Sequence, residues 1–166
     1  MVTPRAEAAW RVLGDVPDPE VPAISVRDLG IVRDVLEHDD GLEVVLTPTY
    51  SGCPATEVIE RSVLDAISAA GLGPARVSMR RAPAWTTDWI SEDGRRKLRE
   101  YGIAPPGPVA VPEGGAPIRI VRRERIACPR CASLHTEQLS AFGSTACKAL
   151  YRCLACQEPF ELFKPI

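Results

Sequence analysis

Hydrophobic residues recur with two different periods in the first hundred residues of the chain, and each period predicts a different kind of element. Over residues 54–70 the apolar side chains fall three or four positions apart, as on one face of a helix, and Gly71 follows as a natural end. Apolar or alternating runs at 31–37 and 42–47 are typical of strands. The His-Asp-Asp-Gly sequence at 38–41 lies between these two runs and predicts a β-hairpin.

Three further segments complete the predicted first module. Residues 6–13 have the pattern of a short helix with one apolar face, and residues 75–81 that of a third strand. Residues 91–101 predict a charged helix with Ser91 as its cap. The order of helix, two strands, helix and strand predicts an α+β fold in which a small mixed sheet of three or four strands carries its helices on one face.

A segment rich in proline and glycine divides the chain. These two residue types fill eight of the fourteen positions from 104 to 117, so the segment can neither form a helix nor pack a core. We therefore expect an α+β domain at 1–103, a linker at 104–117 and a second module at 118–166. The charge changes at the same place, from net −6 over residues 1–116 to net +4 over residues 117–166.

Composition limits the class of protein further. A chain of 166 residues with 45% hydrophobic content has room for one ordinary domain and a small module. The longest stretch without a charged residue spans thirteen positions, 44–56, whereas a membrane-spanning helix needs ~20 apolar residues. The N-terminus has neither the basic region nor the apolar run of a secretory signal. We expect a cytoplasmic protein without a membrane segment.

Four of the six cysteines form two Cys-x-x-Cys pairs with 21 residues between them: Cys128, Cys131, Cys153 and Cys156. Each pair places two sulfurs on one side of a tight turn, and an intervening hairpin can bring the two turns together in a tetrahedral metal site. Disulfides are disfavoured in a reducing cytosol, and a module of this size needs a staple to fold. The pattern predicts a structural zinc β-ribbon, with an iron–sulfur cluster as the alternative.

Other residues near the ribbon cysteines leave alternatives open. Cys147 is a fifth thiol that fits a small buried hydrophobe, a reactive thiol beside Lys148, or a cluster ligand. His135 could serve as a substitute ligand, although four cysteines already complete a set. Five arginines could contact phosphate, but no aromatic residue is interleaved with them, so an acidic protein surface is at least as good a partner as a nucleic acid: Arg119, Arg122, Arg123, Arg125 and Arg130.

The remaining cysteine, Cys53, follows an apolar strand and precedes Pro54, which is favoured as the first residue of a helix. If the helix begins at Pro54, the free N–H groups and the dipole of its first turn stabilise a thiolate at Cys53. Such a thiolate can bind a soft metal, carry sulfur or attack an electrophile. An inert cysteine near a helix cap is the equally weighted alternative.

Two carboxylates, Asp18 and Glu20, lie in a proline-rich loop that could help to hold a metal or grip a partner, or could simply form a turn. Neither histidine of the chain belongs to a Ser-His-Asp or Cys-His arrangement, and no glycine-rich phosphate loop is present. The residues give little support to catalysis by this chain alone.

Several longer segments resemble known families. DPEVPAISVRDLGIVRDV at 18–35 and VVLTPTYSGCPATEVI at 44–59 resemble the small domain of SufT-like iron–sulfur assembly auxiliary proteins. PAWTTDWISEDGRRKLREYGIAPP at 83–106 and the cysteine-rich segment at 128–160 narrow the resemblance to the PaaD-type subunits of the bacterial phenylacetyl-CoA epoxidase system. The resemblance extends from about residue 16 to the C-terminus.

This resemblance implies an α+β auxiliary domain with a C-terminal zinc ribbon that acts in aerobic phenylacetate degradation. It also implies that Cys53, the loop with Asp18 and Glu20, and the four ribbon cysteines are characteristic positions. Ala132 stands where many zinc ribbons have glycine. Such subunits are thought to mature or repair a client metallocentre rather than to perform the oxygenation.

The leading hypothesis is therefore a non-catalytic maturation factor whose Cys53 handles iron, a cluster or sulfur and whose ribbon docks the client. The client would be an oxygenase or reductase subunit of the epoxidase system, and the iron–sulfur assembly machinery is a further partner. One rival hypothesis is a structural or electron-transfer subunit with an iron–sulfur cluster in the ribbon. Another is a zinc-ribbon protein that binds nucleic acid, which we disfavour.

Overall fold

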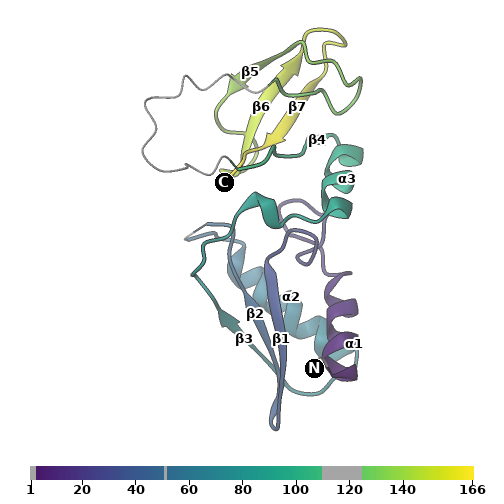
Figure 1. Cartoon of the computed structure of the whole chain (residues 1–166), viewed down its shortest axis with the longest axis vertical. Helices are drawn as coiled ribbons and strands as arrows, with labels where there is room; N and C mark the ends of the chain where they lie inside the picture. The colour runs from purple at the N-terminus through teal and green to yellow at the C-terminus, as the bar shows by residue number, and fades with distance from the viewer. Residues whose placement is uncertain (1–2, 51, 110–124) are drawn as a thin grey trace. The chain divides into compact units, whose positions relative to one another are not determined.

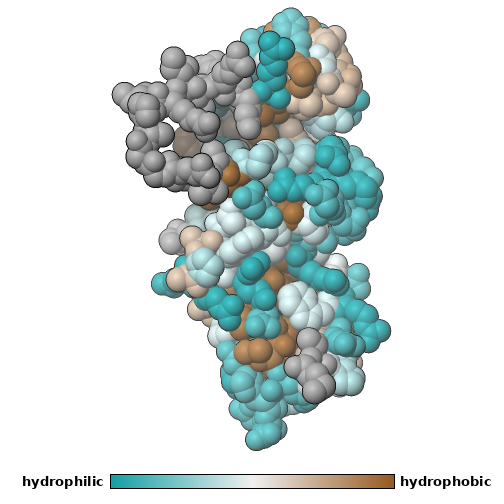
Figure 2. Space-filling model, in the orientation of Figure 1, coloured by the Kyte–Doolittle hydropathy of each residue, from teal (hydrophilic) through white to brown (hydrophobic). Residues whose placement is uncertain are grey.

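The computed structural model describes residues 3–50, 52–109 and 125–166, and these form two compact units, Met1–Gly94 and Arg95–Ile166. No helix among the described residues is both long enough and apolar enough to cross a membrane. Figure 2 shows polar residues over much of the face in view, with the hydrophobic ones in small separate patches.

The first unit is built on a three-stranded sheet in the order β1-β2-β3, with β1 at Val32–His38, β2 at Gly41–Leu46 and β3 at Ala75–Met79. The hairpin β1–β2 is antiparallel, and β2 and β3 are parallel. A parallel pair needs a crossover, which the helix α2 at Thr56–Ala69 supplies. The α+β fold with a small mixed sheet is confirmed.

The helices of this unit complete its core. Helix α1 at Pro4–Leu13 packs against α2 and β1, and α2 also packs against β3 (Figure 1). Val63 and Ile67 of α2 and Leu42 and Val44 of β2 are fully buried. Burying aliphatic side chains of this size stabilises a fold by about 1.5–3 kcal/mol each. The helical spacing that predicted α2 thus arises from its contact with the sheet.

A short segment near the end of the first unit is fixed by its tryptophans. The indole N–H of buried Trp85 donates to the carbonyl of Leu29 at 2.9 Å. The 3-10 helix η1 at Thr87–Trp89 follows, and Gly30 passes so close to Trp89 that a Cβ at position 30 would lie 2.6 Å from the Trp89 carbonyl oxygen. Helix α3 at Glu92–Tyr101 then begins with Ser91 as its cap, because the Ser91 hydroxyl accepts the N–H of Gly94 at 2.9 Å.

The second unit contains a four-stranded sheet in the order β4-β7-β6-β5 (Figure 1). Its strands are β4 at Ile103–Ala104, β5 at Thr136–Ser140, β6 at Lys148–Cys153 and β7 at Pro159–Phe163. Strands β5, β6 and β7 are antiparallel neighbours, and β4 pairs parallel with β7. Ala104, the first residue of the segment predicted as a linker, therefore lies in a strand of this sheet.

The core of the second unit is small. One cluster of buried side chains surrounds the cysteines: Ala104, Cys128, Cys153, Phe160 and Leu162. The other buried hydrophobic residues of the described part of this unit are Leu98, Ile103, Cys147, Ala149 and Phe163. The rings of Tyr151 and Phe160 stack with their centroids 5.7 Å apart. The core of a unit of this length rarely supplies more than about 3–5 kcal/mol, so an additional constraint would stabilise it markedly.

Candidate metal centre

Two tight turns carry the four cysteines of the Cys-x-x-Cys pairs. In the first turn, the carbonyl of Cys128 accepts the N–H of Ala132 at 2.9 Å. In the second, the N–H of Cys153 donates to the carbonyl of Glu158 at 3.0 Å. The residue after the second cysteine has a left-handed backbone in both turns, with φ of 61° at Ala132 and 64° at Gln157. The two turns therefore share one backbone form.

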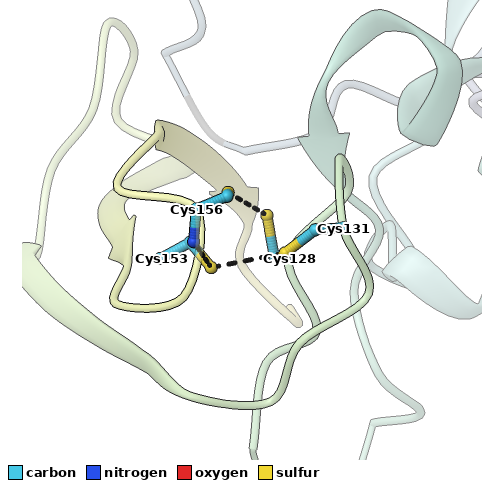
Figure 3. Close-up of side chains that lie close together, drawn as sticks. All are labelled: Cys128, Cys131, Cys153 and Cys156. Atoms are coloured by element: carbon cyan, nitrogen blue, oxygen red, sulfur yellow. Dashed lines mark hydrogen bonds between the residues drawn. The ribbon is translucent and has the colours of Figure 1, made fainter.

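The four sulfur atoms point toward one another from these two turns (Figure 3). All four lie within 4.8 Å of one another. The Sγ atoms of Cys128 and Cys156 are 3.8 Å apart, and those of Cys131 and Cys153 are 3.6 Å apart. A tetrahedral ion with metal–sulfur bonds of ~2.3 Å holds its ligands about 3.8 Å apart along each edge. The chain thus carries a Cys₄ metal-binding cluster whose spacing fits one tetrahedral ion.

The pKa values of two cysteines of the cluster, Cys153 and Cys156, are shifted in opposite directions. The N–H of Cys156 holds the pKa of Cys153 down, against the effect of burial, at about 6. The N–H of Glu158 lowers the pKa of Cys156 as well, but burial and the neighbouring Cys153 sulfur outweigh it and raise that pKa to about 12. One thiolate therefore forms readily and suppresses the next. A divalent cation removes this conflict because it neutralises the thiolates that bind it.

The chemistry of such a site is structural. Four protein ligands complete a tetrahedral shell and leave no position for water or substrate. Zinc bound there would join the turn at Cys128 to the end of β6 and so connect segments far apart in the chain. This cross-link is the additional constraint that the small core of the unit requires.

Two residues considered as further ligands lie outside the cluster. Cys147 is buried immediately before β6, and its sulfur lies 3.0 Å from the Thr145 hydroxyl. Cys153 ends the same strand, which places the Cα atoms of the two cysteines roughly 20 Å apart along it. The His135 side chain is exposed, and its carbonyl accepts the N–H of Leu154 at 2.8 Å. Across the described ranges, the four ribbon cysteines are the only group of three or more His, Cys, Asp or Glu residues arranged to hold a metal ion.

The basic residues singled out in the sequence are only partly described. Arg119, Arg122 and Arg123 lie outside the described residues. Arg125 is exposed, and Arg130 lies 4.0 Å from the carboxylate of Glu158. The described part of this group therefore contains one arginine that has an acidic neighbour and one that is open to solvent.

Cys53 lies in a turn between β2 and α2 rather than directly at a helix start. Helix α2 begins at Thr56 with Ala55 as its cap residue, so the prediction of a helix from Pro54 is wrong by two residues. The physical reason is a separate turn, in which the Cys53 N–H donates to Tyr50 at 3.3 Å and the Cys53 carbonyl accepts from Thr56 at 3.1 Å. Cys53 is 8% exposed.

The neighbours of Cys53 show where this thiol lies relative to solvent. Gly52 and Pro54, on either side of it, are both exposed. Gly52 has φ of 82°, a conformation that favours glycine, and a Cβ added there would contact nothing within 4 Å. Cys53 is therefore a buried thiol on a surface turn.

The acidic loop uses its first carboxylate to fix its own shape. Asp18 is 6% exposed, and its Oδ1 accepts the N–H groups of Glu20 at 2.9 Å and Val21 at 2.8 Å. The loop closes through a bridge between Pro17 and Ser25. This pattern is an Asx-type turn, which holds Glu20 half-buried in a defined position.

Sequence reasoning missed several buried polar groups, among them Lys148 and Thr47. Lys148 is only 3% exposed, and its Nζ lies 2.9 Å from a carboxylate oxygen of Glu161. The Thr47 hydroxyl is also buried, and no hydrogen-bond partner for it exists among the described residues. The sequence held no signal for either group, because lysine and threonine are ordinarily exposed. Lys148 lies in β6, and Thr47 directly follows β2.

Comparisons with known proteins match both modules. Residues 6–79 match the family model described as iron–sulfur cluster assembly protein, and residues 118–164 match the one described as PaaD zinc beta ribbon domain. The fold of the first unit recurs in a crystal structure of a DUF59 domain from Bacillus anthracis, at 24% identity and a TM-score of 0.53, over 57% of this chain and 91% of that one. The class of protein is thus an iron–sulfur-assembly-type domain joined to a zinc ribbon.

Two curated relatives narrow this class. A protein of Escherichia coli (strain K12), named as the D component of 1,2-phenylacetyl-CoA epoxidase, is 47% identical over 98% of this chain and 94% of its own length. The Fe-S protein maturation auxiliary factor of Porphyromonas gingivalis (strain ATCC BAA-308 / W83) is 33% identical over 53% of this chain and 85% of its own. The chain belongs to the PaaD family of phenylacetyl-CoA epoxidase subunits.

Proposed function

We propose that this chain is an accessory subunit of a phenylacetyl-CoA epoxidase system in aerobic phenylacetate degradation, and that it matures or repairs a client metallocentre without catalysing the epoxidation. Family membership over nearly the whole chain supports the accessory role. The observation that carries the maturation role is the match of residues 6–79, which include Cys53, to an iron–sulfur cluster assembly family. The client is an iron–sulfur or di-iron subunit, either the oxygenase or the reductase.

In this proposal the sulfur atom of Cys53 handles the iron, cluster or sulfur. A thiolate is a soft ligand that suits iron and iron–sulfur clusters, and it can also carry sulfur as a persulfide. The position of Cys53 on a turn between the exposed residues Gly52 and Pro54 supports a thiol that needs only a local opening to meet its cargo. Asp18 and Glu20 act as a supporting loop of defined shape.

The ribbon serves as a docking module held by zinc. A single ion fits the 3.6 and 3.8 Å sulfur separations, whereas an iron–sulfur cluster places several iron and sulfide atoms between its ligands and separates them further. This spacing supports zinc over a cluster, and with it a docking role over electron transfer.

The test replaces Cys53 with serine in an epoxidase system reconstituted from purified subunits. We expect the iron content and the turnover of the client to fall to the level seen without this chain. Cys147→Ser is the matched control, since it also alters a buried thiol but lies in the other unit. That control should keep full activity.

Both variants must retain zinc and the circular dichroism spectrum of the wild type, so that a loss of activity reports the thiol rather than unfolding. A Cys53→Ser protein that loads iron into the client at the normal rate would contradict the proposal. So would an equal loss in both variants.

A further inference from the structure

The second unit contains a pocket of about 490 Å³ beside the first cysteine turn. Its walls come from three segments of the same unit, namely the last turn of α3, residues 104–107, and residues 125–129 together with Ala132. Arg95 anchors one wall, because its guanidinium donates to the carbonyl of Pro106 at 2.6 Å. Cys128, a member of the cysteine cluster, belongs to another wall. The pocket volume lies within the range of small-ligand and side-chain pockets, ~300–1,000 Å³.

Two arginines lie at this pocket, Arg99 from α3 and Arg125 from the segment before the first cysteine turn. Both are exposed. Neither guanidinium has a hydrogen-bond or ion-pair partner within the part of the chain that the structure describes, whereas Arg96, one turn earlier in α3, pairs with Glu100 at 2.7 Å. Two positive charges beside one cavity therefore remain available for an anion.

The rest of the lining is apolar. It contains proline rings and small aliphatic groups: Ala104, Pro105, Pro106, Ile126, Ala127, Pro129 and Ala132. A lining of this kind suits a large apolar side chain. The combination of an apolar floor with arginines matches the composition of protein interface anchors.

The donors at the pocket favour a carboxylate over a phosphate. Phosphate sites commonly gather several backbone N–H groups at a helix N-terminus. Here Pro105, Pro106 and Pro129 have no N–H to offer, and the pocket lies at the C-terminal end of α3, where the helix has no free N–H groups. A guanidinium fork satisfies a carboxylate with two parallel hydrogen bonds and needs no backbone donor.

We propose that this pocket docks an acidic peptide segment of a partner protein, with an apolar side chain on the proline-lined floor and flanking carboxylates on Arg99 and Arg125. The proposal rests on the docking role suggested for the ribbon and assigns the surface that performs it. It does not depend on Cys53, which lies in the other unit.

The test measures binding of short peptides to the full-length, zinc-loaded chain by fluorescence anisotropy. The probes are pentapeptides with Phe, Leu or Tyr at the centre and Glu on both sides, and the references carry Gln in place of Glu. We expect the Glu peptides to bind at least about 10-fold more tightly than the Gln peptides, and Arg99→Ala and Arg125→Ala each to weaken binding about 10-fold. Arg96→Ala removes the same charge from the same helix and should leave the affinity unchanged.

A charge-reversal variant distinguishes the loss of a specific contact from misfolding. Arg125→Glu should reject the Glu peptides and gain affinity for the same peptides with Lys in place of Glu. Cys53→Ser should bind the Glu peptides normally, so failure of the maturation proposal and failure of this one are separately visible.

Four results would overturn the proposal. They are equal binding of Glu and Gln peptides, an equal loss in the Arg96 variant, tighter binding of inorganic phosphate than of the peptides, or tighter binding of the free small carboxylate 3-phenylpropionate than of the peptides. The last two outcomes would make the pocket a small-anion site instead.

Discussion

At the scale of single residues, Ala132 is held in a conformation that its side chain disfavours. It has φ of 61°, and its N–H donates to Cys128 inside the first cysteine turn. A left-handed backbone strains any residue with a Cβ by roughly 1–2 kcal/mol, whereas glycine adopts it freely. The turn therefore forms despite this strain, and the hydrogen bond from the Ala132 N–H to the Cys128 carbonyl helps to hold it.

Ala132→Gly should stabilise the second unit by up to about 1 kcal/mol, since relief of the strain exceeds the ~0.5–1 kcal/mol that extra freedom of glycine in the unfolded chain costs. Chemical denaturation of the zinc-loaded protein measures the change. Ala66→Gly in the middle of α2 is the control with the opposite sign, and it should lose about 1 kcal/mol. A destabilised Ala132→Gly protein would contradict the strain argument.

The ion pair of Lys148 with Glu161 is a second residue-scale feature with a measurable consequence. Burial alone would raise the pKa of Glu161, but the Ser144 N–H and the Lys148 ammonium outweigh it and lower that pKa. Because the pKa of Glu161 is lower in the folded chain than in the unfolded chain, the ionised carboxylate stabilises the fold. This stabilisation is complete at pH values above the unfolded pKa of ~4.3. It is lost as the pH falls through the folded pKa.

Glu161→Gln should therefore destabilise the second unit at pH 7, by about 1–3 kcal/mol, because it leaves the buried Lys148 ammonium without its anion. The difference from wild type should shrink as the pH falls below ~4.3. Denaturation curves of both proteins between pH 3.5 and 7 check this. The double variant with Lys148→Met should recover most of the loss at pH 7, and a difference that stays constant with pH would refute the assignment.

At the scale of elements, the sequence predicted the helices whose apolar side chains recur over several turns and the strands whose apolar and polar side chains alternate over several residues. The helix α2, the hairpin β1–β2 and the Ser91 cap of α3 were foreseeable because Val63, Ile67 and their neighbours must face the sheet and because capping is local. The cysteine turns were foreseeable because two Cys-x-x-Cys pairs at this spacing are typical of metal sites.

Other elements depend on contacts that no local pattern records. Strand β4 is only Ile103–Ala104, too short for periodicity, and it exists because β7 offers it a partner edge. The start of α2 was misplaced because Pro54 suits both a first helical position and the turn that precedes Thr56. The pocket between residues 104–107 and 125–129 joins segments that are distant in sequence, so it too was beyond local reasoning.

At the scale of the whole molecule, the two units obtain their stability from different sources. The first buries aliphatic side chains such as Val63 and Leu42 between helices and sheet. The second has a smaller core, part of it around the cysteines, and a Cys₄ cluster through which a bound metal would hold its two turns together. Two units stabilised independently should unfold as two events rather than one.

Calorimetry of the zinc-loaded chain should therefore show two transitions, and a strong chelator should abolish only the one that belongs to the second unit. The reason is that the free energy of metal binding is folding free energy for a site made of separate turns. The protein as purified should be colourless and release one zinc per chain, whereas visible absorbance would indicate an iron–sulfur cluster.

Ile67→Ala supplies the reciprocal control. Ile67 is fully buried in the first unit, and its truncation should lower the free energy of unfolding of that unit by about 2–5 kcal/mol. Only the transition of the first unit should therefore shift to a lower temperature. Amide hydrogen exchange can assign each event, because chelation should expose β5, β6 and β7 while α2 stays protected. If chelation instead melted both units together, the ribbon would be part of a single cooperative fold, and Cys53 could not be tested apart from it.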